Sequence, residues 1–175
     1  LKLYKINTNL VEYQKDLIEN SLDFTHENDD FFLGVSASAF ETLKENYNDK
    51  YEYILPDLYF DKNLFNDPTF GSVDLNTNIK VHNYDTNKFS KFFVNNFKWK
   101  SLNTNYLNNF NGHFLGQVKN VNYEAKNISL YKKDTTSEVF GALGYLSEIQ
   151  LYKKTKNDNT QFLTPKILFR VAPNH

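Results

Sequence analysis

A strict two-residue alternation of apolar and polar side chains constrains the fold of this chain more than any other feature. It is clearest between residues 70 and 82. The odd-numbered row there is Val73, Leu75, Thr77, Ile79 and Val81, and it alternates with the polar row Ser72, Asp74, Asn76, Asn78, Lys80 and His82. Successive side chains of a β-strand point to opposite faces, whereas a helix needs a period of 3.6. The segment is therefore predicted to be a strand with one apolar and one polar face.

The same alternation recurs along the chain, and clusters of Asn, Asp, Lys and Ser separate the runs. Such clusters are typical of chain reversals between strands. The pattern predicts about nine strands. Their ranges are 1–10, 17–28, 31–42, 50–62, 70–83, 89–102, 108–125, 138–153 and 161–172. We therefore expect an all-β fold, an antiparallel β-meander that occupies residues 1–175 as one domain.

Strand length separates two classes of all-β protein. A strand of a soluble domain usually has about 5 or 6 residues, whereas a tilted strand that crosses a bilayer needs about 9 to 11. Most of the predicted strands are of the long kind, which favours part of a large transmembrane β-barrel. The 16 Phe, 12 Tyr and single Trp include rings near strand ends, such as Tyr51, Tyr53, Tyr59 and Trp99, as in an interfacial girdle. A soluble glycan-binding β-sandwich is the alternative that the pattern leaves open.

Composition and motifs indicate neither an enzyme nor a cofactor. The formal net charge of −1 gives no general attraction to nucleic acid, and Cys is absent. The four histidines have no metal-binding spacing, so we expect no metal site. Asp57 and Asp61 share one face of a predicted strand, which is usually a solvated face rather than a catalytic pair. Pro56 and Pro165 interrupt predicted strands, where a bulge or a loosened pairing is the simplest explanation.

Three stretches resemble the LPS-assembly protein family, LptD, also called the organic solvent tolerance family. The strongest is Phe162–Pro173, which is similar to that family's strand with the pattern Leu-Thr-Pro-Lys, alternating apolar residues, Arg, an aromatic and Pro. Val171 stands where the family has an aromatic residue. Lys50–Pro56 with Tyr59–Asp61, and Phe140–Leu146 with Leu151–Lys154, are similar to two further strands.

The resemblance implies an internal fragment of the C-terminal barrel of such a protein, in the outer membrane of Gram-negative bacteria. The function it implies is lipopolysaccharide transport and assembly, with lipopolysaccharide, a plug lipoprotein (LptE-like) and periplasmic bridge components as partners. In the family, acyl chains leave through a seam between the first and last barrel strands, to which Pro56 and Pro165 are not assigned. Another outer-membrane barrel, a receptor or a porin, is the alternative within membranes.

The polar rows of the predicted strands are the candidate functional residues. In a barrel wall, one face of each strand meets lipid and the other lines a wet lumen. We expect six residues to line the lumen, where amides and charges can exchange hydrogen bonds with passing sugars. They are Asp74, Asn76, Asn78, Lys80, His113 and Gln117.

Overall fold

The structure is a computed structural model that describes residues 16–44, 50–85, 87–107, 110–155 and 159–173. All regular elements in these ranges are strands. They are β1 (Leu17–Asn28), β2 (Phe31–Thr42), β3 (Tyr51–Asp67), β4 (Gly71–Asp85), β5 (Lys88–Lys100), β6 (Thr104–Leu107), β7 (Phe110–Lys126), β8 (Thr136–Ile149), β9 (Leu151–Lys154), β10 (Thr160–Leu163) and β11 (Lys166–Val171). No helix in the described part of the chain is long and apolar enough to cross a membrane.

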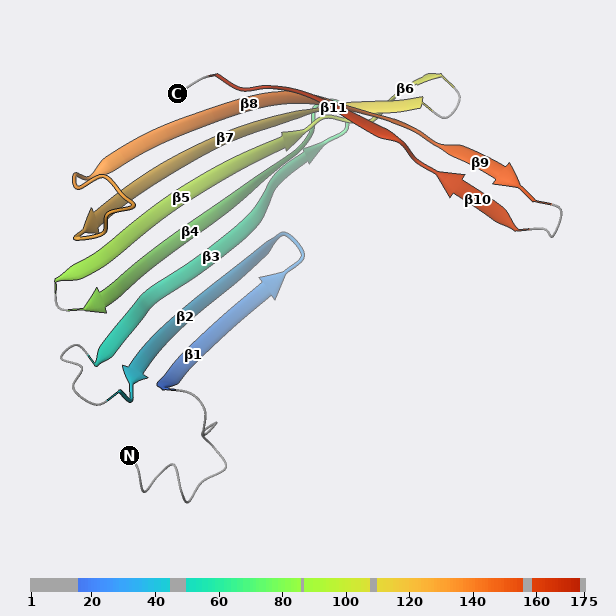
Figure 1. The fold of residues 1–175 in the computed structure, drawn as a ribbon. Coiled ribbons are helices and arrows are strands. Elements are labelled where there is room, and N and C mark those ends of the chain that lie inside the picture. Colours follow the sequence, from blue (N-terminus) through green and yellow to red (C-terminus); the bar gives the residue numbers. More distant parts are fainter. Residues whose placement is uncertain (1–15, 45–49, 86, 108–109, 156–158, 174–175) are drawn as a thin grey trace.

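The strands lie side by side nearly in chain order (Figure 1). The order across the sheet is β1-β2-β3-β4-β5-β7-β8-β11, β6 pairs with β7, and every pair is antiparallel. The β9–β10 hairpin projects beyond this sheet. The predicted all-β antiparallel meander is therefore confirmed. Among the described residues the sheet is open, because β1 pairs only with β2 and β11 only with β8.

Several predicted strand bounds are confirmed and others are corrected. Strands 17–28 and 31–42 have the predicted bounds, whereas 1–10 lies outside the described residues. The predicted strand 138–153 divides into β8 and β9. The predicted strand 161–172 divides into β10 and β11, and β6 lies where a turn was predicted.

Both prolines loosen the strand pairing where they stand. The Leu55–Pro56 bond is cis, and the β3–β4 register shifts between Ile54 and Asp57, as at a β-bulge. Pro165 lies between β10 and β11, and its carbonyl accepts a hydrogen bond of 3.2 Å from the N–H of Ile149. Because proline has no N–H, it cannot return that bond. The bulge and the loosened pairing that the sequence suggests are both present.

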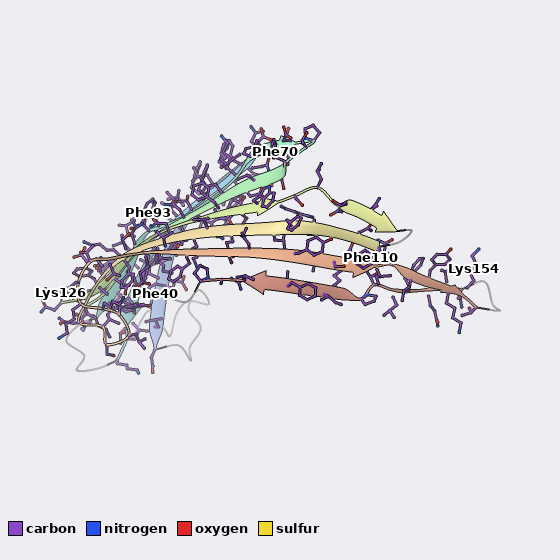
Figure 2. All side chains as sticks on the ribbon, turned by 90° about the horizontal axis from the view of Figure 1, so that it is seen from above. Phe40, Phe70, Phe93, Phe110, Lys126 and Lys154 are labelled. Carbon is purple, nitrogen blue, oxygen red and sulfur yellow. The ribbon has the colours of Figure 1, made fainter. Side chains whose placement is uncertain are left out.

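The sheet is a single layer, with side chains projecting from both faces (Figure 2). Among the described residues Ala125 is the one buried hydrophobic residue, and Ser90 and Ser147 are the buried polar ones. Many large apolar side chains are exposed instead: the exposed fractions of Phe169, Leu143 and Val171 are 66%, 66% and 76%. The fold therefore has no apolar core in the described residues, where its strands are joined by hydrogen-bonded ladders.

The turn between β3 and β4 is fixed by a carboxylate. The backbone N–H groups of Phe70 and Thr69 donate to Asp67 Oδ1 at 2.9 and 2.7 Å. Both bonds favour the charged form and hold the pKa of Asp67 below its ordinary value of 3.8.

We expect an NMR titration of the Asp67 carboxyl to give a midpoint below 3.8. A lowered pKa means that the turn is stabilised at neutral pH and that this stabilisation is lost as the pH falls through the lowered value. The Asp67→Asn variant keeps an acceptor but cannot titrate, so its turn should not respond to pH in this range. A midpoint at or above the ordinary value would contradict the assignment.

Candidate functional site: the polar face of the sheet

The strand register assigns each side chain to one of two faces, because directly paired residues point the same way. One row runs from Asp74 on β4 through Lys98 on β5 and Gln117 on β7 to Ala142 on β8. We call the face that carries this row the polar face. All six candidate residues lie on it: Asp74, Asn76, Asn78, Lys80, His113 and Gln117.

The four candidates on β4 are bound to the neighbouring strand β3. Asn63 Nδ2 donates to Asp74 Oδ1 at 2.7 Å, and Asn78 Nδ2 donates to the carbonyl of Leu58 at 3.2 Å. Asn76 Nδ2 donates to Asp61 Oδ2. The ammonium of Lys80 lies 3.0 Å from the carboxylate of Asp57.

Two carboxylates of β3 take part in this ladder of side chains. Asp57 is paired with Lys80, and Asp61 accepts from Asn76 and from the hydroxyl of Tyr59, the latter at 3.0 Å. Each acid thus has its own cross-strand partner, as on a solvated face. Tyr59 lies within β3 on the polar face, so its predicted place near a strand end in an aromatic girdle is wrong.

The two candidates on β7 lie apart from the β4 ladder. Gln117 Nε2 donates to Asn96 Oδ1 on β5 at 2.7 Å. His113 pairs with Leu146 across to β8, four residues nearer the start of β7 than Gln117. The structure therefore brings together the β4 residues, joins Gln117 to the same row through Lys98, and leaves His113 at a distance along β7.

The opposite face, which we call the apolar face, carries most of the large hydrophobic side chains. Its members on the central strands include Phe60, Val73, Leu75, Ile79, Phe93, Phe97, Trp99, Val118, Val139 and Leu143. The Trp99 indole N–H donates to the carbonyl of Phe70 at 2.8 Å, next to the β3–β4 turn. A hollow of about 530 Å³ lies on this face between Trp99 and Leu143.

Glycines shape that hollow. A Cβ on Gly116 would lie 3.1 Å from the ring of Trp99, whereas a Cβ on Gly141 would meet no atom within 4 Å. A glycine inside a strand is typical of a close approach of two backbones. Gly144 is such a site, because a Cβ there would lie 3.2 Å from the carbonyl oxygen of Phe169, whereas Gly141 is not.

The apolar side chains of this face do not follow one hydrogen-bonded row. One row is apolar over its first five strands and polar beyond them, where it meets Asn122 on β7 and Ser137 on β8. Its apolar members are Phe24, Val35, Leu58, Ile79 and Phe93.

On β8 and β11 the apolar residues lie farther along the strands. Phe169 on β11 pairs with Tyr145, which pairs with Phe114 on β7. Tyr145 stands eight residues beyond Ser137 on β8. Eight residues of strand span about 27 Å, and the seven strand spacings from β1 to β11 span about 34 Å. We call the band of apolar residues on this face the apolar belt. It is inclined by about 40° to the rows of directly paired residues that run across the strands.

Several polar side chains on the apolar face are bound to neighbours, although Lys62 on β3, which pairs with Leu75, is not among them. The hydroxyl of Thr77 donates to Asn95 Oδ1 at 2.8 Å, and Asn122 donates to Asn120. Lys91 is paired with Glu124 at 3.3 Å, near the start of β5. Such pairing lowers the cost of placing these groups in surroundings without water.

Comparison with known proteins gives no identification. No protein-family model matches the chain, and a search of curated proteins finds no significantly similar relative. In the described residues, no group of three or more His, Cys, Asp and Glu side chains could hold a metal ion. The resemblance of the three quoted stretches to the LPS-assembly family therefore stays a resemblance, and the geometry of the two faces carries the functional argument.

Sequence reasoning missed four cations on the polar face. They are Lys98, Lys100, Lys119 and Arg170. Lys98 and Lys100 share their parity with Asn96, and Lys119 shares its parity with Gln117, so each belonged to a polar row visible in the sequence. What the sequence did not contain was the register that places the rows of β5, β7 and β11 beside one another.

Proposed function

We propose that this chain forms part of the wall of an outer-membrane β-barrel that transports and assembles lipopolysaccharide. In this proposal the apolar face meets the lipid and the polar face lines the lumen. The oblique apolar belt is the observation that carries it.

Strands of a transmembrane barrel tilt by about 35 to 45° from the barrel axis. A bilayer is a flat slab, so the lipid-facing belt must stay level while the strands pass through it at an angle. The lipid-facing residues are therefore displaced along the strand from each strand to the next. The belt of the apolar face crosses the rows at about 40°, which is the offset that this tilt requires.

The polar face suits the passage of sugars. Its amides and hydroxyls are engaged with one another, as in the Asn63–Asp74 and Gln117–Asn96 bonds, and can exchange these partners for sugar hydroxyls. Contacts of this kind are individually weak, which transport requires. The resemblance of Phe162–Pro173 to the LPS-assembly family then favours lipopolysaccharide as cargo, with a plug lipoprotein and periplasmic bridge components as partners. The proposed role involves no catalysis.

Cysteine labelling of neighbouring positions tests the orientation of the wall. The segment has no natural Cys, so single cysteines at Leu75, Asn76, Asn78 and Ile79 can be compared in the parent protein in membranes. We expect Asn76→Cys and Asn78→Cys to react with a water-soluble maleimide. Leu75→Cys and Ile79→Cys should react only with a lipid-soluble reagent.

Two outcomes would contradict the proposal. If Leu75→Cys and Ile79→Cys react with neither reagent, a protein layer covers the apolar face and a soluble sandwich replaces the barrel. If the labelling is as expected but a photo-crosslinker at Asn78 captures no lipopolysaccharide in cells, the barrel stands and the cargo is wrong. A receptor or a porin is then the better reading.

A further inference from the structure

Four cations of the polar face have no partner in the described part of the chain. The side chains of Lys98, Lys100, Lys119 and Arg170 make no hydrogen bond or ion pair there, and all four are exposed. Two other lysines of the polar face do have partners: Lys80 binds Asp57 and Lys166 binds Glu148, at 3.0 and 3.1 Å.

The four cations border two adjoining hollows of the polar face. Lys98, Lys100 and Arg170 line a hollow of about 430 Å³. Lys119 and Arg170 line a second one of about 370 Å³. Gln117, Ala142 and Arg170 belong to both, so the hollows form one continuous strip across β5, β7, β8 and β11.

Small residues on β8 leave open space in the middle of the strip. Ala142 and Gly144 lie between the cations of β5 and β7 on one side and Arg170 on the other. A Cβ at Gly144 would already lie 3.3 Å from Leu168 Cδ1, so a larger residue there would fill the strip.

The charge of the strip is strongly positive. Asp74 is its one lining acid, and that carboxylate already accepts from Asn63. Two acids of β3 on the same face, Asp57 and Asp61, are engaged with Lys80 and Asn76. Four ammonium and guanidinium groups thus face one carboxylate, an arrangement that attracts anions.

The spacing of the cations selects the kind of anion. Lys98 and Lys100 are two residues apart on β5, about 7 Å. Arg170 lies three strand spacings from Lys100, about 14 Å. One small ion therefore does not reach all four groups, whereas a chain of sugars with anionic groups several ångströms apart does.

We propose that this strip, bordered by Lys98, Lys100, Lys119 and Arg170, binds an anionic oligosaccharide through phosphate or carboxylate groups on its sugars. Gln117 also lines the strip and gives one amide N–H to Asn96, and its amide oxygen is a potential acceptor for sugar hydroxyls. The inference rests on the proposed function in one respect, because it takes the polar face to be open to water and sugars.

Binding in non-ionic detergent tests the strip on the whole protein. The probes are a phosphorylated oligosaccharide, an oligogalacturonate, the neutral oligosaccharide of matching length and inorganic phosphate. We expect the two anionic oligosaccharides to bind at least ten-fold more tightly than the neutral one. The binding should weaken as salt rises, because exposed charges are screened. The stronger anionic probe then shows whether phosphate or carboxylate is the better ligand.

A triple variant, Lys98→Gln, Lys119→Gln and Arg170→Gln, should weaken binding of the anionic probes at least ten-fold. The matched control is Lys166→Gln, which removes a paired cation of the same face that does not line the strip and should leave binding unchanged. Heat-modifiable gel mobility shows that each variant is folded.

The possible failures can be told apart. Equal binding of neutral and anionic oligosaccharides, or binding of inorganic phosphate alone, would overturn the strip while leaving the labelling result and the proposed function intact. Conversely, if the labelling experiment fails and the triple variant still loses anion binding, the strip stands as a site on a different kind of protein.

Discussion

Replacing Gly71 with alanine is expected to destabilise the sheet by about 3 kcal/mol, because two independent costs coincide at this position. The φ angle of Gly71 is +91°, in a region that residues with a side chain rarely adopt. A Cβ there would also lie 2.0 Å from the carbonyl oxygen of Lys100 and 2.8 Å from the Cα of Ser101. Both contacts are with backbone, so no change of rotamer relieves them.

A second glycine of the same sheet provides the control. Gly141 has open space where its Cβ would stand, so Gly141→Ala should change the free energy of unfolding by no more than about 0.5 kcal/mol. Urea unfolding of both variants in lipid vesicles, followed by gel mobility, measures the difference. Gly71→Asn separates the two costs, because Asn tolerates a positive φ but keeps the overlap. Equal stability of Gly71→Ala and Gly141→Ala would mean that Lys100 and Ser101 move aside freely.

Alternation along the sequence predicted the strands well because it reports local geometry. The side chains of 17–28 and 31–42 alternate on a backbone that pairs over its whole length, and the predicted bounds are those of β1 and β2. Alternation does not report whether each backbone group finds a partner. It therefore continues through Thr164-Pro165, where the missing N–H of Pro165 interrupts the ladder and divides the predicted strand 161–172.

The candidate site was predictable in its composition but not in its arrangement. The polar row of Asp74, Asn76, Asn78 and Lys80 follows from one strand alone. Its bonds to β3, and the gathering of Lys98 with Arg170, depend on which residues of different strands face each other. That register is set by turn lengths and bulges, such as the shift between Ile54 and Asp57, and one strand's pattern does not contain it.

Arginine substitutions on the apolar face should lower the free energy of unfolding strongly at some positions of a row and only slightly at other positions of the same row. Leu58 and Ser137 lie in one hydrogen-bonded row, on β3 and β8. The oblique belt passes close to Leu58, whereas on β8 it passes near Leu143, about 20 Å along the strand from Ser137. In a bilayer, arginine costs about 2 to 4 kcal/mol at the midplane and about 0 to 1 near the interface.

We therefore expect Leu58→Arg and Leu143→Arg to lower the free energy of unfolding in vesicles by about 2 to 4 kcal/mol, and Ser137→Arg by less than about 1 kcal/mol. Asn76→Arg on the polar face is a further control and should be mild, since that side chain would reach water. The comparison is informative because Leu58 and Ser137 lie in one row and differ in their depth in the slab. Among the described residues Leu58 pairs with Val35 and Ile79, whereas Ser137 pairs with Asn122 alone. If Ser137→Arg costs as much as Leu58→Arg, the apolar side chains are not arranged around a level bilayer, and the barrel orientation is wrong.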